Sequence, residues 1–179
     1  MIVHVYRTVL IGLVTLAPLL MATPSSAATD EVGRATPALV VKQLDGRELD
    51  LTALRGKVVI LNIWATWCPP CRAEMPMLDA FYRQHQSEGV VLVGLSADEL
   101  HDRKDVVKVM QGLAYPAALL KEAKVNGFGA PRALPITYVI DADGIMRARR
   151  LPGRGPLTEA ELTGLVVPLL VHSEVSAPQ

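Results

Sequence analysis

One short motif constrains this chain more than any other feature. Its only two cysteines, Cys68 and Cys71, are spaced Cys-x-x-Cys. The apolar, β-branched run 58–63 precedes them and predicts a buried strand, and a helix-compatible segment follows them. The cysteines are therefore expected where a strand ends and a helix begins. The first turn of a helix has unpaired backbone N–H groups and the positive end of the helix dipole, so a thiolate is stabilised there.

This position assigns a different role to each cysteine. Cys68, at the mouth of the turn, is predicted to attack a disulfide, and Cys71, one turn into the helix, to release the product by closing a ring with Cys68. Pro69 and Pro70 between them suit a helix start because their missing N–H groups cost little there. The two prolines also remove donors that could face the Cys68 thiolate. We therefore expect a reducing or intermediate potential.

Other uses of a Cys-x-x-Cys pair fit less well. Structural zinc needs four ligands, usually two such pairs, and the chain has one pair. A structural disulfide of this spacing would constrain the unfolded chain little. Cu(I) transfer stays open because Met75 and Met77 place soft sulfur nearby, although methionine at helical spacing is more often part of a core. A peroxiredoxin would need a Thr-x-x-Cys setting, which neither cysteine has.

The block from Leu61 to Pro76, LNIWATWCPPCRAEMP, resembles the thioredoxin superfamily and, within it, the TlpA/ResA/CcmG branch. The likeness runs from about Gly33 to about Val171. It implies an α/β thioredoxin-like fold, in which helices flank a central mixed β-sheet. It also implies an N-terminal β-hairpin extension, and an extra helix and strand between the Cys-x-x-Cys helix and a cis-proline. Proteins of this branch are extracytoplasmic thiol–disulfide oxidoreductases, commonly reductants in cytochrome c maturation or respiratory-complex assembly.

The resemblance also draws attention to two polar residues near the cysteines. Ordinary thioredoxins carry a proton-shuttling aspartate six residues before the first cysteine, where this chain has Asn62. Glu74 lies three residues after Cys71, on nearly the same helix face. It is therefore predicted to act as the base for Cys71, as the branch implies. The alternative is that Glu74 only stabilises the first turns of the helix.

The second signature of the family makes Pro135 the cis-proline. The exposed backbone of Leu134 would then pair with an extended substrate segment. The approach to this proline, 130–132, is longer and more rigid than usual, which bears on partner choice. The remaining predicted substrate-binding residues are Trp67, Pro69 and Pro70.

The chain divides into three segments. Residues 1–28 predict a signal peptide or membrane anchor: Arg7 precedes an apolar run of about 14 residues, short of the roughly 20 that span a bilayer. Small residues follow, with a plausible cleavage point after Ala27 or Ala28. Residues 29–172 form the thioredoxin-like domain, and 173–179 a flexible tail. Either fate of the leader places the domain in the periplasm, free or anchored to the inner membrane.

Charge and composition bear on partners. Lys plus Arg and Asp plus Glu both total 18, so no overall field attracts nucleic acid. We expect a monomer with no metal and no cofactor other than the Cys68–Cys71 disulfide. Its expected partners are protein disulfides, in an apocytochrome c or a metallochaperone, and a membrane protein that returns electrons. A protein disulfide oxidant and a Cu(I)-transfer protein are the alternatives.

The remaining elements follow from local patterns. Hairpins are expected at 40–51 and 136–151, strands at 90–96 and 115–120, and a final helix after Thr158. Segment 98–105 should be a polar surface leading into a helix at 106–111, and 121–127 a short helix stopped by Gly127. His85 falls on a core-facing stripe near the end of its helix, where a capping or surface histidine is expected and not a ligand, and His101 is expected at the surface. The arginines of 147–154 should keep an edge strand from aggregating or, as an alternative, dock an acidic partner.

Overall fold

The computed structural model describes residues 32–175, which form a seven-stranded mixed sheet with helices against it. The strand order is β2-β1-β5-β4-β3-β6-β7. The strands are β1 (Leu39–Gln43), β2 (Glu48–Asp50), β3 (Val58–Trp64), β4 (Val90–Ser96), β5 (Ala117–Asn126), β6 (Ile136–Ile140) and β7 (Met146–Arg150). The helices are α1 (Pro69–His85), α2 (Arg103–Met110) and α3 (Glu159–Val175), with short 3-10 turns at Leu51–Leu54, Gln86–Glu88 and Leu100–Asp102.

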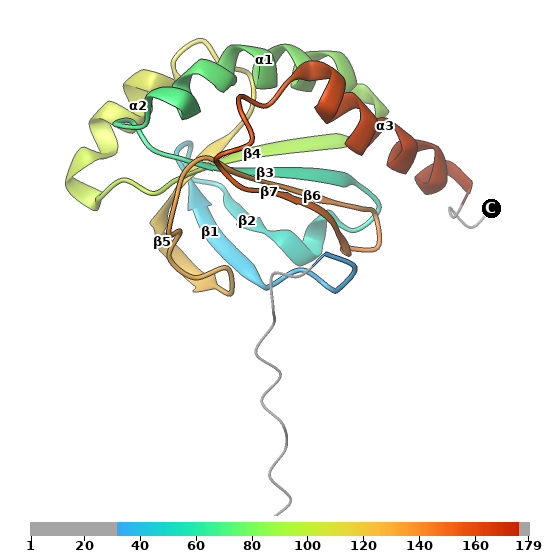
Figure 1. Ribbon diagram of the computed structural model, residues 1–179. Coiled ribbons are helices and arrows are strands. Elements are labelled where there is room, and N and C mark those ends of the chain that lie inside the picture. The colour runs from blue at the N-terminus through green and yellow to red at the C-terminus, as the bar shows by residue number, and fades with distance from the viewer. Residues whose placement is uncertain (1–31, 176–179) are drawn as a thin grey trace, which may run out of the picture.

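β3 lies at the centre of the fold because its sequence is apolar on both faces. Every residue of the strand is buried, as expected for a strand covered on two sides. β3 pairs in parallel with β4 and antiparallel with β6. Helices α1 and α3 lie over one face of the sheet (Figure 1). The predicted N-terminal hairpin, β1–β2, packs its Leu39 and Val41 into the core of the other face, against Leu61 and Ile63.

The extra helix and strand expected before the cis-proline are present as α2 and β5, but the predicted helix at 121–127 is wrong. β5 continues through this segment to Asn126. Its first residues pair in parallel with β4, and its later residues pair antiparallel with β1, from Leu39 opposite Asn126 to Gln43 opposite Ala118. The backbone partners supplied by β1 outweigh the weak helical preference of the local sequence.

Two further expectations need correction. His85 is buried, not a surface residue: its ring packs on Phe81 at a centroid distance of 4.4 Å, and its Nδ1 lies 2.9 Å from the Glu88 carboxylate. Helix α3 passes through Pro168 and continues to Val175, so the domain boundary predicted at 172 falls inside it. The leader predicted at 1–28 lies outside the described residues. Within 32–175, none of the helices is long and apolar enough to span a bilayer.

The packing behind the cysteines leads to a test of the core. A Cβ atom at Gly94 in β4 would lie 3.0 Å from Trp64 Nε1 and 3.2 Å from Tyr115 Cε2. Trp64 and Tyr115 are both buried. Gly94→Ala should therefore lower the free energy of unfolding by about 1–3 kcal/mol through overpacking. Denaturant unfolding measures this change.

The matched control is Gly164→Ala. Gly164 is an exposed position of helix α3, where an added Cβ meets nothing within 4 Å. Because alanine has the higher helix propensity, this change should stabilise the protein by up to about 1 kcal/mol. Equal unfolding midpoints for the two variants would show that Gly94 is not needed for close packing.

Candidate active site

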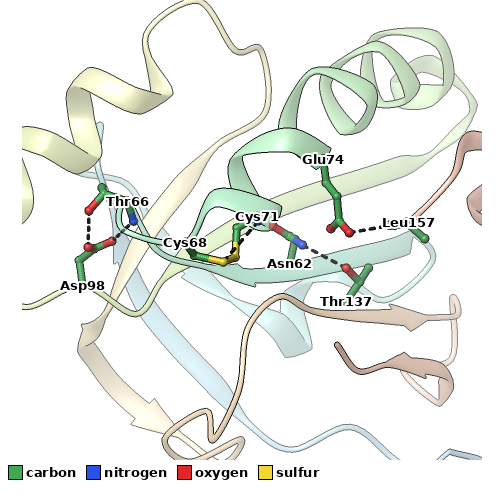
Figure 2. The surroundings of a disulfide bond; sticks show 8 residues. All are labelled: Asn62, Thr66, Cys68, Cys71, Glu74, Asp98, Thr137 and Leu157. Carbon is green, nitrogen blue, oxygen red and sulfur yellow. Dashed lines mark hydrogen bonds between the residues drawn. A yellow bond between two sulfur atoms is a disulfide. The ribbon is translucent and has the colours of Figure 1, made fainter. Parts of the chain in front are cut away.

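Cys68 and Cys71 are joined by a disulfide at the start of α1, with their Cα atoms 5.3 Å apart. Cys68 is the N-cap residue of the helix, and its Sγ accepts a hydrogen bond from the Cys71 N–H at 3.3 Å. Pro69 and Pro70 occupy the first two helical positions, where a missing N–H breaks no helical bond. The junction of strand, disulfide and helix is visible in Figure 2, and it agrees with the placement predicted from the sequence.

An apolar shell surrounds the two sulfurs. Cys68 is 3% exposed and Cys71 is 1% exposed. They share one buried cluster with residues from the end of β3, from both neighbouring helices and from β5, namely Trp64, Ala65, Met75, Val106 and Leu119. Little water therefore reaches Cys71, so a proton that leaves or joins it needs an acceptor or donor within the protein.

A buried aspartate anchors the approach to Cys68, and the sequence analysis missed it. Asp98 is 1% exposed. Its carboxylate accepts bonds from the Thr66 N–H at 2.9 Å and the Thr66 Oγ1 at 2.6 Å (Figure 2). It also accepts a bond from the Ser96 Oγ at 2.6 Å. The available signal was a Ser-x-Asp sequence directly after a buried strand, but the polar residues that follow favoured a surface segment. Asp98 thus ties the loop before Cys68 to the end of β4.

Glu74 is buried on the helix face turned toward the sheet. Its side chain is 4% exposed and extends from α1 toward β3, where Asn62 lies (Figure 2). Oε1 accepts a bond from the Leu157 N–H at 2.9 Å, while Oε2 has no hydrogen-bond partner among the described residues. Burial raises the pKa of the Glu74 carboxyl. The Leu157 N–H and the charge of Arg150 oppose this rise in pKa, and the charge of Glu161 adds to it.

Arg150 connects this region to α3. The sequence placed it among exposed edge-strand arginines, but it is 7% exposed. Its Nε donates to the Glu161 carboxylate at 2.9 Å, and its guanidinium also donates to the Gly155 carbonyl at 2.9 Å. The ion pair therefore holds the 151–157 loop, whose last residue, Leu157, hydrogen-bonds Glu74.

Asn62 has a structural role in the sheet. It is 1% exposed, and its Nδ2 donates to Thr137 Oγ1 at 3.0 Å (Figure 2). The two residues are also backbone partners between β3 and β6. Thr137 lies two residues after Pro135, so this bond links the strand before the disulfide to the strand after the cis-proline.

The Leu134–Pro135 peptide bond is cis, as the resemblance implied. A groove of about 550 Å³ separates the 130–134 segment from the disulfide. We call it the Cys68 groove; four predicted substrate-binding residues line it together with Cys68, namely Trp67, Pro69, Pro70 and Leu134. Trp67 is 68% exposed there. Pro135 and Glu74 are buried and do not line it, so the site has an open side at the groove and a buried side behind the disulfide.

Residues 32–149 match a family described as the AhpC/TSA family. The chain belongs to this family. It is 37% identical over 114 residues to the thiol-disulfide oxidoreductase ResA of Bacillus thuringiensis (strain Al Hakam). That match covers 64% of this chain and 66% of the ResA protein, just under two thirds of its length.

Two solved structures have a similar fold. A thiol:disulfide interchange protein of the thioredoxin family from Chlorobium tepidum TLS has a TM-score of 0.63 and 28% identity, covering 79% of this chain and 99% of that chain. A secreted thiol-disulfide isomerase from Corynebacterium glutamicum has a TM-score of 0.61 and 26% identity, covering 75% and 84%. The thioredoxin-like fold expected from the sequence is confirmed.

The first site prediction concerns Asp98. Asp98→Ala leaves the Thr66 N–H and both hydroxyls without their charged acceptor, so the free energy of unfolding should fall by roughly 3 kcal/mol. Thr66→Val removes only one of these bonds and should cost about 1 kcal/mol. Asp105→Ala, on the exposed side of α2, is the control and should cost less than about 1 kcal/mol. A loss from Asp98→Ala no larger than the control would contradict the anchoring role.

The second prediction is a pH dependence of stability that arises from Glu74. Because its pKa is raised in the folded state, the folded protein binds more protons than the unfolded chain just above the ordinary glutamate value of 4.5. Stability should therefore be complete below that pH and fall as pH rises through the folded pKa.

Glu74→Gln removes this dependence while keeping an acceptor for the Leu157 N–H. Unfolding midpoints of the oxidised protein at pH 4 to 8 should show the variant gaining on the wild type as pH rises. A constant difference between the two across that range would mean that the Glu74 pKa is not raised.

Proposed function

We propose that this protein is a thiol–disulfide oxidoreductase that reduces disulfides of other proteins outside the cytoplasm. The observation that carries the proposal is the Cys68–Cys71 disulfide at the N-terminus of α1, where Cys68 lines the same groove as Leu134, the residue that precedes cis-Pro135. The name of the Bacillus relative, a thiol-disulfide oxidoreductase, supports it. A secreted relative in Corynebacterium supports an extracytoplasmic location.

The reaction consists of two thiol–disulfide exchanges. In the reduced protein, the Cys68 thiolate attacks one sulfur of the substrate disulfide, which forms a mixed disulfide and releases the other substrate sulfur as a thiolate that takes up a proton. The Cys71 thiolate then attacks Cys68 Sγ, closes the disulfide seen here and releases the second substrate thiol. Two electrons pass to the substrate, so a dithiol donor, which we propose is a membrane protein, must reduce the pair again.

The substrate binds on the open side of the site. Leu134, which precedes the cis-proline, offers its backbone to an extended substrate segment. Trp67, Pro69 and Pro70 supply apolar contact in the same groove. This surface is compatible with a monomer that receives protein disulfides, such as those of an apocytochrome c or a metallochaperone.

Glu74 manages the proton of Cys71 in this proposal. Cys71 lies one helical turn before it and is buried. A carboxyl whose pKa is raised by burial can exchange a proton with a thiol nearer to neutral pH than an exposed glutamate can. Asn62 cannot take this role because an amide does not titrate. In this proposal, proton transfer takes place on the buried side of the site, and Cys68 attacks the substrate disulfide on the open side.

The direction of electron flow follows from the first turn of α1. Prolines at its first two positions remove two N–H groups, and the Cys71 N–H donates to Cys68 Sγ. A thiolate with fewer donors is less stabilised, and the disulfide is then harder to reduce. The two prolines therefore favour a reductant over a protein disulfide oxidant.

Cu(I) transfer is a second candidate because Met75 packs in the same buried cluster as both sulfurs. Its thioether is a soft donor that would suit Cu(I) beside two thiolates. The reduced protein would then retain one equivalent of Cu(I) against a competing chelator, and Met75→Leu would weaken that retention. The same chelator assay separates this binding role from catalysis of disulfide exchange.

The test of the proposed function uses the full chain and its single-cysteine variants. Cys71→Ser, mixed with an oxidised protein substrate, should accumulate a mixed disulfide through Cys68, whereas Cys68→Ser should accumulate none because Cys71 is shielded. The wild-type couple, equilibrated against dithiothreitol, should have a potential near or below about −220 mV. A value near about −120 mV would identify an oxidant, and an equal adduct through Cys71 would contradict the assigned roles.

A further inference from the structure

The surface around Cys68 is basic although the whole chain is neutral. Basic and acidic residues both number 18 in the full sequence. The Cys68 groove adjoins two other hollows. One, of about 570 Å³, lies between Trp67 and the first turn of α1 and includes Arg72. The other, of about 660 Å³, lies on the far side of the 130–133 segment and includes Arg132 and Arg149.

Among the described residues, four basic residues and one acidic residue line these three hollows. The acidic one, Glu99, is paired with Lys121 at 3.0 Å, so these two charges largely cancel. Arg72 and Arg132 are exposed, and neither guanidinium makes a hydrogen bond or ion pair with any residue in 32–175. Their positive charge is therefore available to a ligand.

The two arginines line adjoining hollows next to Cys68. Arg72 follows Cys71 directly, in the first turn of α1, and its hollow shares Trp67 and Pro69 with the Cys68 groove. Arg132 lines both the Cys68 groove and the hollow beyond the 130–133 segment. A polypeptide segment that lies along Leu134 with its cysteine at Cys68 would therefore have both arginines nearby, one from α1 and one from the 130–134 segment.

We propose that Arg72 and Arg132 select protein disulfides whose cysteines are flanked by acidic residues. This inference rests on the proposed function and names its substrate class. The occupant is an extended segment with a carboxylate on either side of its reacting cysteine and an apolar side chain against Trp67. An arginine guanidinium suits the task because it remains charged and can bind a carboxylate with two parallel hydrogen bonds.

The expected effect is moderate because both arginines are exposed. Charge complementarity at such a surface acts mainly on association, and salt weakens it. We expect the kcat/KM ratio between acidic and basic substrates to be roughly tenfold at low salt. At about 0.3 M salt, where the screening length falls to roughly 6 Å, most of this preference should be lost.

The experiment measures kcat/KM of the full-length reduced protein for three disulfide-bonded peptides. The peptides are identical except that glutamate, glutamine or lysine flanks each cysteine. Arg72→Glu, Arg132→Glu and the double variant are compared with the wild type. The readout is the ratio of the rates on the glutamate and lysine peptides, because a change in Cys68 reactivity alters both rates equally and cancels.

Lys57→Glu is the matched control. Lys57 is exposed and immediately precedes β3. Lys57→Glu therefore changes the net charge by the same amount as a single arginine reversal. It does so at the opposite end of a seven-residue strand, roughly 20 Å from the site. The control should keep the wild-type preference, each single reversal should reduce it, and the double variant should prefer the lysine peptide.

The outcomes separate this inference from the proposed function. Equal rates of the wild type on all three peptides would overturn the acidic preference and leave the reductase activity standing. A preference for glutamate that survives the double reversal would also overturn it, since other groups would then be responsible. Failure to reduce even the glutamine peptide would overturn the proposed function itself.

Discussion

The backbone ladder on both edges of β3 is the constraint on which the rest of the site depends. β3 pairs with β4 over its whole length and with β6 from Val59 opposite Ile140 to Ile63 opposite Ile136. Pro135 directly precedes Ile136, and Cys68 follows the end of β3 by four residues. The distance between the disulfide and the cis-proline is therefore set by hydrogen bonds inside the sheet, and not by the flexible parts of either loop.

Polar groups buried at the end of this ladder refine the arrangement. Asp98 holds Thr66, and Asn62 holds Thr137, so each loop around the disulfide is tied to a neighbouring strand. Glu74 differs because it is a buried carboxylate in which one oxygen, Oε2, has no hydrogen-bond partner among residues 32–175. An unpaired buried carboxylate is costly, and the cost falls when the group takes up a proton. Glu74, whose charged form is disfavoured by burial, is thus the group to which we assign the proton transfer.

In the proposed function, the two sides of the site have different tasks. The buried side contains the Glu74 carboxyl, whose pKa is raised. The open side carries Arg72 and Arg132, whose side chains have no partner among the described residues, beside the exposed Trp67. Exclusion of water raises the pKa of the carboxyl to which we assign proton transfer, whereas selection of a protein partner needs a surface that the partner can reach. Cys68 lies at the boundary between them, which is where a sulfur that contacts both a substrate and Cys71 must be.

Local sequence patterns were sufficient for the strand–disulfide–helix unit, since the apolar run 58–63, the two prolines and the cysteine spacing all act within a few residues. The cis bond at Pro135 and the base role of Glu74 were predicted with the help of the family resemblance. Neither the isomer of a proline peptide bond nor the burial of a carboxyl can be deduced from one residue and its neighbours. Only the tertiary structure decided that 121–126 is a strand and that Asp98 anchors the active-site loop. In both cases the deciding partner, β1 for the strand and Thr66 for the carboxylate, is distant in sequence and comes into contact through folding. The periodicity of a segment shows only where its own apolar and polar residues lie. The contacts that decided these two features depend on which other segment packs against it.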